Sequence, residues 1–524
     1  MDSAVTHLPP VIEQMLDPGF YPHSTSDSIT LLQTHISYVL LTGSYAYKVK
    51  KPVNLGFADF STLDRRRHFL LEERRLNERG APGLYLQVMP ICPTSSGFRF
   101  TSPDDPRSSG APVEYALKMH QFAQDALFTN LVTLGKVDDH LIDSLGRTIA
   151  EYHRTARTDA TIAQFGRPER IEAVLNDNYR QTERFVGGPQ TSEQFEQTRH
   201  FTDAFCTGRA KLLSQRVAGG FIRECHGDLH LRNICLWRDR INLFDCIEFN
   251  ESFRFIDAMQ DAAFAIMDLE AFGRPDLAST LLNIYAERTG DWEGLQLLPL
   301  YLTRHAYVRA KVSSLLLDEQ EVSESDKCEA ARSARNYYRL AFQYAQARRG
   351  RIIVVCGLPG AGKSTVARYL SRHLRTAYVR SDAVRKHLAG IPLDQRGDSE
   401  IYSPAMTART YQRLLELGLL LAHDGFTVIL DAKYDLRSSR QAVIERARVA
   451  GIPLQFVYCA ISLEARRQQL LNRRGDISDA TVEILNQSIA GFEEFSDAER
   501  PLVTRLGATD DQAMRELARA LSAD

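Results

Sequence analysis

The sequence predicts a two-domain protein, with a mixed α+β domain over residues 1–345 and an α/β domain over residues 350–524. The chain has 524 residues, which is more than a single hydrophobic core usually supports. Residues 30–50 alternate as strands do, whereas helical periodicity dominates most of residues 126–347. After residue 350 short apolar runs alternate with helical stretches, which is typical of a parallel sheet covered by helices on both faces.

The composition gives no bulk electrostatic reason to expect nucleic acid or an anionic membrane as a general partner. Hydrophobic residues make up 44% of the chain, charged residues make up 25%, and the formal net charge is -2. No basic segment followed by an apolar core opens the sequence, and no apolar run reaches the roughly 18 residues that span a bilayer. We therefore expect a cytoplasmic protein with no membrane partner, and we make no prediction of its oligomeric state.

The first domain is expected to begin with strands and one helix, before a long helical part. Period-two alternation predicts the strands, and clusters of Pro, Gly, Ser and Asp predict the turns and loops. In chain order the expected elements are a turn at Thr42–Ser44, a strand over Tyr45–Lys50, a helix over Asp64–Glu78, short strands over Leu84–Pro93, a loop over Pro93–Pro112 and a strand-to-helix crossing over Val113–Met119. Helices are expected over Ala126–Arg216, strands at Leu236–Trp237 and Ile241–Phe244, and helices again after Asp245 through Ala347, interrupted at Asp318–Asp326.

A short polar motif marks a candidate phosphoryl-transfer site in this domain. It reads His-Gly-Asp-x-x-x-x-Asn from His226 to Asn233, and Asp245 follows on the next expected strand. Transfer of a γ-phosphoryl group needs a base that orients the acceptor hydroxyl and ligands that hold Mg²⁺ on the triphosphate. Asp228 is the expected catalytic base, and Asn233 and Asp245 are the expected Mg²⁺ ligands.

The same chemistry needs a lysine on an early strand, which neutralises the α and β phosphates and is fixed by a carboxylate on the next helix. Lys48 and Lys50 share one strand face because side chains alternate, and Lys48 fits the Ala-x-Lys spacing better. Glu73 lies on the following helical stretch, with Glu72 one position away. Lys48 and Glu73 are the predicted nucleotide-binding pair.

These residues resemble the aminoglycoside phosphotransferase family over roughly residues 30–310. The resemblance implies a bilobal protein-kinase-like fold with a helical C-lobe, ATP and Mg²⁺ as cofactors, adenine binding by the backbone near Glu114–Met119, and supporting roles for Asp257 and Asp261. Only Thr42–Ser44 stands where a G-x-G-x-x-G loop would cover the phosphates, so GTP stays open as an alternative to ATP. Another domain occupies the chain end with which that family commonly builds its acidic aminoglycoside pocket. We therefore expect a small-molecule hydroxyl acceptor and do not predict an antibiotic.

The second domain is expected to alternate strands and helices, with Gly425 in the left-handed conformation that often follows a helix. The expected strands are Ile352–Cys356, Tyr378–Asp382, Thr427–Leu430 and Leu454–Ala460, and the expected helices are Ser364–Leu374, Arg409–His423, Arg437–Val449 and Glu464–Arg474.

The segment Gly357–Ser364 reads G-x-x-x-x-G-K-S between an apolar strand and a helix, which is the arrangement of a P-loop. Glycines let backbone N–H groups point at phosphates, and the helix N-terminus adds a partial positive charge. Lys363 is expected to bridge the β and γ phosphates, and Ser364 is expected to bind Mg²⁺. The predicted nucleotide-binding residues are Gly357, Gly360, Gly362, Lys363, Ser364 and Thr365.

Acceptor chemistry is expected at the carboxyl ends of the strands, where ligands bind in open α/β sheets. Asp382, at the end of the second expected strand, is the predicted catalytic base, and Arg385 is predicted to hold an acceptor phosphate. Asp431 follows the third expected strand and is predicted to lie near the metal ion, as a ligand, or near the acceptor. A basic helical patch suits a lid over the phosphates. Its members are Arg466, Arg467, Arg473 and Arg474, of which the last two are predicted to bind nucleotide.

These residues resemble the P-loop kinases grouped with polynucleotide 5'-hydroxyl kinases, gluconate kinases and zeta-type toxins, over roughly residues 350–500. Asp382 and Arg385 match the Asp-x-x-Arg acceptor motif of that group, and Arg473 or Arg474 falls where its lid arginine lies. The chain as a whole resembles bacterial proteins that fuse an aminoglycoside phosphotransferase-like domain with an ATP-binding domain.

The preferred interpretation is a bifunctional ATP-dependent phosphotransferase in which each domain has its own small-molecule hydroxyl acceptor. Two alternatives stay open. In one, a domain is a nucleotide sensor that regulates the other. In the second, the P-loop domain is a kinase for nucleic-acid ends, with Arg437 and Arg440 lining a groove beside the lid.

Overall fold

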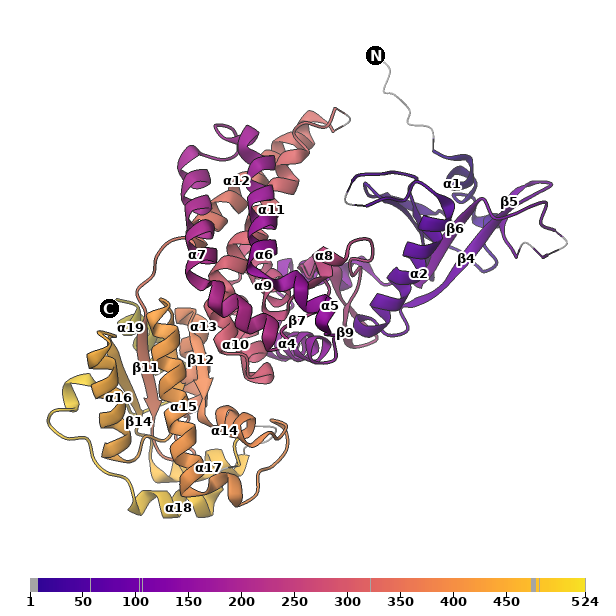
Figure 1. Cartoon of the computed structure of the whole chain (residues 1–524). Helices are drawn as coiled ribbons and strands as arrows, with labels where there is room; N and C mark the ends of the chain where they lie inside the picture. The colour runs from indigo at the N-terminus through magenta and orange to yellow at the C-terminus, as the bar shows by residue number, and fades with distance from the viewer. Residues whose placement is uncertain are drawn as a thin grey trace. The chain divides into compact units, whose positions relative to one another are not determined.

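The computed structural model describes residues 8–56, 58–102, 104–105, 107–320, 322–472, 477–479 and 481–523. Over these residues the chain divides into two compact units (Figure 1). The first is formed by Met1–Val137, Thr155–Arg167 and Leu212–Asp261, and the second by Asp138–Arg154, Pro168–Lys211 and Ala262–Asp524. The predicted domain boundary between residues 345 and 350 falls inside the second unit and stays a prediction.

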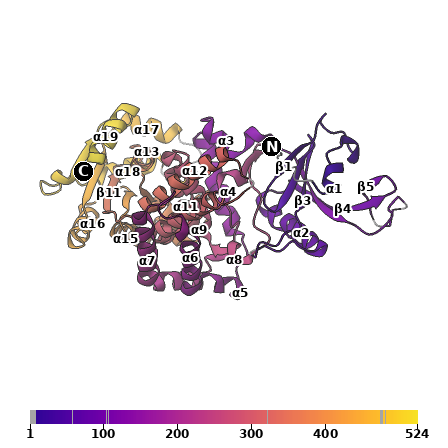
Figure 2. The same cartoon turned by 90° about the horizontal axis from the view of Figure 1, so that it is seen from above.

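The first unit is built on an antiparallel sheet with the strand order β1-β2-β3-β6-β4-β5. Helix α2 (Leu63–Gly80) is capped by Thr62, whose Oγ1 accepts a hydrogen bond from the Arg65 N–H at 3.3 Å. The helix packs on β4 and β6, and Figure 2 shows it on one side of the sheet. The strands are β1 Thr30–Gln33, β2 Ser37–Leu41, β3 Tyr45–Lys50, β4 Tyr85–Thr94, β5 Gly97–Phe100 and β6 Glu114–His120.

Two short antiparallel pairs carry the first polar motif. Strand β7 pairs with β10, and β8 pairs with β9. The motif joins β7 to β8, and Asp245 follows β9, so a loop between strands supplies Asp228 and Asn233 as the sequence predicts. The bounds in this unit are β7 Ile222–Glu224, β8 Ile234–Trp237, β9 Arg240–Leu243, β10 Phe255–Asp257, α1 Pro10–Gln14, α3 Phe128–Thr133, α5 Ala160–Ala163 and α8 Glu251–Arg254.

Helices form the part of the second unit that precedes residue 350. Helix α11 ends at Leu315 and α12 begins at Glu324, so the helices are interrupted near Asp318–Asp326 as predicted, although the last three residues of that stretch belong to α12. The two helices pack against each other. Across the described ranges, no helix has both the length and the apolar character needed to cross a bilayer. The bounds are α4 Asp139–Arg154, α6 Pro168–Thr182, α7 Ser192–Ala218, α9 Ala258–Ala271, α10 Pro275–Thr289, α11 Leu298–Leu315 and α12 Glu324–Tyr344.

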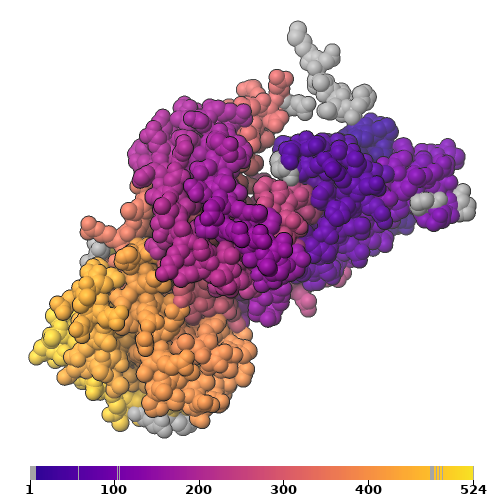
Figure 3. All heavy atoms as spheres, viewed as in Figure 1, coloured from indigo at the N-terminus to yellow at the C-terminus, as the bar shows by residue number. Residues whose placement is uncertain are grey.

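The rest of the second unit is a parallel sheet with the strand order β12-β13-β11-β14-β15, packed between helices. Strand β11 is buried along almost all its length because it lies in the middle of the sheet, and its Ile353 and Val355 join a core with Val366 and Leu370 of α13. In the space-filling view this segment is one contiguous body, coloured orange to yellow (Figure 3). The antiparallel sheet of the first part and the parallel sheet of the second agree with the predicted α+β and α/β classes.

The strands of this sheet are β11 Arg351–Cys356, β12 Ala377–Arg380, β13 Thr427–Asp431, β14 Leu454–Cys459 and β15 Val503–Leu506, and its helices are α13 Lys363–Leu374, α14 Ser381–Ala389, α15 Pro404–His423, α16 Arg437–Val449, α17 Leu463–Asn472, α18 Val482–Ala490 and α19 Asp511–Ala523.

Three element predictions need correction. Residues 113–119 do not cross from strand to helix, because β6 hydrogen-bonds to β3 on one side and to β4 on the other. The expected loop from Pro93 contains β5, which pairs back onto the end of β4. Strand β12 stops at Arg380 and helix α14 begins at Ser381, so Asp382 lies in the first turn of a helix and not at a strand end.

Gly80 tests the packing of α2. A Cβ at this position would overlap the carbonyl oxygen and Cβ of Leu243 on β9. Because that oxygen belongs to the backbone, we expect Gly80→Ala to lower the free energy of unfolding by about 1–3 kcal/mol in denaturant titrations. Gly208, exposed in the middle of α7 with open space around it, is the control, and Gly208→Ala is expected to raise that free energy by about 0.5–1 kcal/mol. A stabilising Gly80→Ala would contradict the packing of α2 on β9.

Candidate active sites

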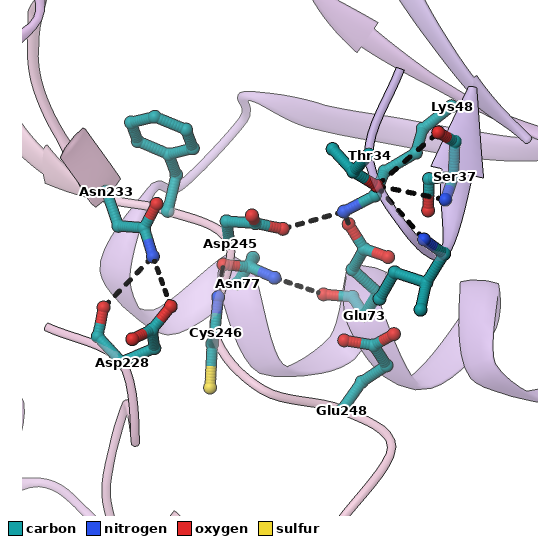
Figure 4. A network of polar contacts seen from close by, with 12 residues as sticks. Thr34, Ser37, Lys48, Glu73, Asn77, Asp228, Asn233, Asp245, Cys246 and Glu248 are labelled. Atoms are coloured by element: carbon teal, nitrogen blue, oxygen red, sulfur yellow. Dashed lines mark hydrogen bonds and ion pairs between the residues drawn. The ribbon is translucent and has the colours of Figure 1, made fainter. Parts of the chain in front are cut away.

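Lys48 lies at the centre of an ion-pair network in the first unit (Figure 4). Its Nζ is 2.6 Å from Glu73 Oε1 and 2.6 Å from Asp245 Oδ1. The Glu73 side chain is fully buried, whereas that of Asp245 is 45% exposed. One carboxylate therefore fixes the lysine, and the other faces a region that a ligand can reach. Glu72, the alternative partner, pairs with Arg75 at 2.9 Å instead.

A second lysine completes the network on its buried side. Lys50 Nζ lies 2.7 Å from Glu73 Oε2 and 2.5 Å from Glu248 Oε1. Lys48 and Lys50 thus share a strand face, as the period of the strand predicts. Burial raises the pKa of Glu248, an effect that the Lys50 ammonium opposes. The sequence analysis did not predict Glu248 as part of this site, although its position three residues after Asp245 could have suggested it.

Lys48 and Asp245 keep their charges through the neutral pH range. Burial alone lowers the pKa of Lys48, but the Asp245 and Glu73 carboxylates raise it well above its ordinary value. Desolvation raises the pKa of Asp245, but the charge and hydrogen bond of Lys48, together with the charges of Lys50 and His226, outweigh this effect and lower that pKa to about 2. Asp245 is therefore ionised, which suits a ligand of a hard divalent cation.

Asp228 and Asn233 lie together in the loop between β7 and β8. Asn233 Nδ2 donates hydrogen bonds to the backbone oxygen of Asp228 at 2.9 Å and to its Oδ2 at 3.2 Å. Figure 4 shows both residues beside Asp245. The turn needs Gly227, at φ +85°, because a Cβ there would lie 2.7 Å from the carbonyl oxygen of Phe253. The Asp228 side chain is 38% exposed, so its carboxylate is accessible to an acceptor.

Asp261 holds the start of this loop from its buried side. The N–H groups of His226 and Gly227 each donate to the Asp261 carboxylate at 2.9 Å. Asp257 pairs with Arg216 at 2.6 Å. Both carboxylates are buried; Asp261 supports the loop, whereas Asp257 joins α7 to the start of α9.

Two residues that sequence reasoning missed hold the Asp245 segment in place. The Asp245 N–H donates to Tyr85 Oη at 3.0 Å, and the Cys246 N–H donates to Asn77 Oδ1 at 2.9 Å. Asp245 has φ +62°, a conformation that few residues other than glycine adopt, so its orientation depends on such contacts. Neither Tyr85, at the start of a strand, nor Asn77, in a helix, carries a sequence signal for this role.

The loop between β11 and α13 has the backbone that the P-loop motif predicts. Gly357, Gly360 and Gly362 have φ values of +140°, +74° and +78°. A Cβ at Gly357 would lie 2.8 Å from the carbonyl oxygen of Cys459, so a larger residue does not fit. Helix α13 begins at Lys363 directly after the loop, and its first N–H groups are the ones available to an anion.

A buried carboxylate stands against the start of α13. Ser364 Oγ donates to Asp431 Oδ2 at 2.7 Å, and Tyr378 Oη donates to the same oxygen at 2.8 Å. Asp431 ends β13, the neighbour of β11 in the sheet. A hydroxyl and a carboxylate oxygen are ligands that suit Mg²⁺, so the two predicted metal ligands are brought together. Thr365 follows in the exposed first turn of α13, and Tyr378 was not predicted.

The predicted acceptor residues both lie on α14. Asp382 Oδ2 is 3.6 Å from Nε of the buried Arg380. Arg385 is almost fully buried, and its Nη1 donates to the carbonyl oxygen of Ile401 at 2.8 Å and to Thr407 Oγ1 at 3.2 Å. These contacts engage the guanidinium inside the protein, and the acceptor roles of Asp382 and Arg385 stay predictions.

Three arginines that the sequence analysis assigned to the surroundings of the second site are either outside the described residues or buried. The predicted lid residues Arg473 and Arg474 lie outside the described residues. Arg440 is fully buried, with Nε donating to Glu499 Oε1 at 2.7 Å and Nη1 donating to the carbonyl oxygen of Tyr434 at 3.1 Å. An enclosed guanidinium does not line a surface groove, so the proposed contact of Arg440 with a nucleic-acid end is wrong.

Two family models match the chain. The model described as a phosphotransferase enzyme family matches residues 129–298, and the model described as an AAA domain matches residues 352–495. The first match includes the motif that begins at His226, and the second includes the P-loop. The resemblances to aminoglycoside phosphotransferases and to P-loop kinases are thereby confirmed, and the chain carries two kinase-type domains.

Relatives from mycobacteria match almost the whole chain. "Uncharacterized protein Rv2004c" of Mycobacterium tuberculosis and "Uncharacterized protein Mb2027c" of Mycobacterium bovis are each 30% identical over 468 residues, which is 88% of this chain and 90% of the relative. Among solved structures, the Mycobacterium tuberculosis APS kinase CysC in complex with AMPPNP and APS is 26% identical, with a TM-score of 0.26, over 33% of this chain and 99% of its own.

Glu73 and Glu72 form a matched pair for testing the first site. Glu73→Gln would leave two buried ammonium groups without the carboxylate they share, and we expect it to lower the free energy of unfolding by about 3–5 kcal/mol. Glu72→Gln removes only a partly exposed ion pair, and we expect a loss of about 1 kcal/mol or less. Denaturant titration of both variants measures the difference, and equal effects would contradict the central place of Glu73.

Proposed function

The chain belongs to the same family as the mycobacterial proteins Rv2004c and Mb2027c, and from that premise we propose that it is a bifunctional ATP-dependent phosphotransferase. Each kinase-type domain transfers the γ-phosphoryl group of ATP to a hydroxyl of its own small-molecule acceptor. The observation that supports this most directly is that each compact unit has its own cluster of residues suited to binding a triphosphate and its metal ion. One contains Lys48 with Asp245, and the other contains the P-loop with Asp431.

At the first site Asp228 takes the proton of the acceptor hydroxyl while the hydroxyl oxygen attacks the γ-phosphorus. The bond between that phosphorus and the oxygen bridging to the β-phosphate breaks, and ADP leaves with the electron pair. Lys48 neutralises the α and β phosphates. Asn233 and Asp245 would hold Mg²⁺, which supplies charge neutralisation on the β and γ oxygens when bound.

At the second site the P-loop N–H groups and Lys363 hold the phosphates, and Ser364 and Asp431 would hold Mg²⁺. Asp382 is the base for the acceptor hydroxyl in this proposal, and Arg385 serves a phosphate on the acceptor. The burial of Arg440 favours a small acceptor over a nucleic-acid end, because it removes one of the two arginines assigned to a nucleic-acid groove. GTP remains an alternative donor at both sites.

A transfer assay with γ-labelled ATP separates the two proposed activities. The full chain is offered a pool of cell metabolites and, separately, RNA and DNA ends. Asp228→Ala is expected to lower one set of labelled products at least about 100-fold, and Lys363→Ala is expected to lower the other set to the same extent. Lys211→Ala, which removes an exposed charge on α7, is the control and should leave both sets unchanged.

The products distinguish the proposal from its alternatives. Labelled nucleic-acid ends that disappear in Lys363→Ala would identify the second domain as a polynucleotide kinase. Loss of both product sets in either single variant would favour a sensor domain that regulates the other domain. Products that survive in both variants would contradict phosphoryl transfer at the two sites.

A further inference from the structure

Helix α10 covers one edge of the parallel sheet in the second unit (Figure 1). Strand β12 stands at the end of the strand order, so its outer edge presents backbone groups that need partners. The side chain of Asn283 on α10 supplies them. Its Nδ2 donates to the carbonyl oxygen of Thr376 at 2.8 Å, and its Oδ1 accepts a hydrogen bond from the Tyr378 N–H at 2.7 Å. One buried amide thus makes the pair of bonds that a neighbouring strand would make.

Tyr378 connects this edge to the second candidate site. Its backbone N–H is held by Asn283, and its Oη donates to Asp431 Oδ2 at 2.8 Å. The same carboxylate oxygen accepts the hydrogen bond of Ser364 at 2.7 Å. Tyr378 and Asp431 are both buried, with 4% and 2% of their surface exposed, so protein groups and not bulk water satisfy this carboxylate oxygen. A continuous set of hydrogen bonds therefore runs from α10 to the start of α13.

We propose that Asn283 and Tyr378 are positioning residues for the metal ligand Asp431 of the P-loop site. Asn283 sets the position of β12, and the Tyr378 hydroxyl sets the orientation of the Asp431 carboxylate. Helix α10 lies within residues 129–298, the segment that matches the phosphotransferase model. A helix of one kinase-type domain thereby organises the site of the other. The inference rests on the proposed function, in which Ser364 and Asp431 hold Mg²⁺ on the nucleotide.

The chain offers a matched control on the same helix. Ser279 lies one turn before Asn283 on α10, and its Oγ donates to the carbonyl oxygen of Ser371 on α13 at 2.8 Å. Ser279→Ala removes this buried hydrogen bond and the long one, at 3.5 Å, that Ser279 Oγ accepts from Asn283 Nδ2, and it leaves both bonds from Asn283 to β12 in place. If Asn283→Ala acted only by loosening the interface, Ser279→Ala would have a similar effect on the P-loop site. If Asn283 acts through Tyr378, Ser279→Ala leaves that site unchanged.

The test measures how ATP binding to the full chain depends on Mg²⁺ concentration. Binding is followed by calorimetric titration, and the second site is taken as the binding that Lys363→Ala removes. Tyr378→Phe, which keeps the ring and the sheet, is expected to raise the Mg²⁺ concentration for half-maximal binding by about tenfold, the usual effect of losing a residue that orients a metal ligand. ATP binding without Mg²⁺ should change less than about twofold, because the P-loop itself is untouched.

Asn283→Ala tests the first link in the set of hydrogen bonds that runs from α10 through Tyr378 to Asp431. It should raise the Mg²⁺ requirement in the same direction as Tyr378→Phe, and it should speed hydrogen exchange at the Tyr378 amide, because that N–H loses its acceptor. In the Tyr378→Phe background it should add no further change in the Mg²⁺ requirement, since the route through the hydroxyl is already broken. Ser279→Ala should match the parent protein in both measurements.

The outcomes separate this inference from the proposed function. If Lys363→Ala abolishes binding at one site while Tyr378→Phe needs no more Mg²⁺ than the parent, the positioning role is wrong and the nucleotide site stands. An effect of Asn283→Ala that is equally large with and without the Tyr378 hydroxyl also overturns the route. If Lys363→Ala leaves all ATP binding unchanged, the proposed function of the second domain fails, and the inference fails with it.

Discussion

A carboxylate withdrawn from water needs a cation or a hydrogen-bond donor, and both candidate sites are organised by this constraint. In the first unit Glu73 is fully buried and lies between Lys48 and Lys50, which fixes α2 against β3. In the second unit Asp431 is buried between the hydroxyls of Ser364 and Tyr378, which fixes the end of β13 against the P-loop helix. In each case a group that we propose to contact the nucleotide lies against a buried carboxylate that the fold has to satisfy.

Backbone N–H and C=O groups withdrawn from water need hydrogen-bond partners as well, and this need is met at the edges of the strands in both sheets. The antiparallel sheet of the first unit carries Lys48 on β3, between β2 and β6, so the lysine rests on a strand that is hydrogen-bonded along both edges. The parallel sheet of the second unit ends at β12, where an asparagine amide takes the place of a further strand. An edge that is covered in this way is closed to pairing with another chain. It also connects the helical part of the second unit to the P-loop part by specific hydrogen bonds.

Local patterns in the sequence predicted the parts of each site that depend on local geometry. Period-two alternation placed Lys48 and Lys50 on one face, and the succession of apolar strand, glycine-rich loop and helix placed Lys363 and Ser364. Tyr85, Asn77 and Tyr378 could not be found in this way, because each acts across a contact between elements distant in sequence. Glu248 is an exception among the residues that were missed, because its closeness to Asp245 in the sequence could have predicted its place in the site.

The most direct measurement is the number of Mg²⁺·ATP molecules that the purified chain binds at saturation, determined by calorimetric titration. The account predicts two equivalents for the parent chain, one for Lys48→Ala, one for Lys363→Ala, and none for the variant that combines both substitutions. A parent chain that binds a single equivalent, lost in either single variant, would contradict the claim that this protein contains two separate nucleotide sites.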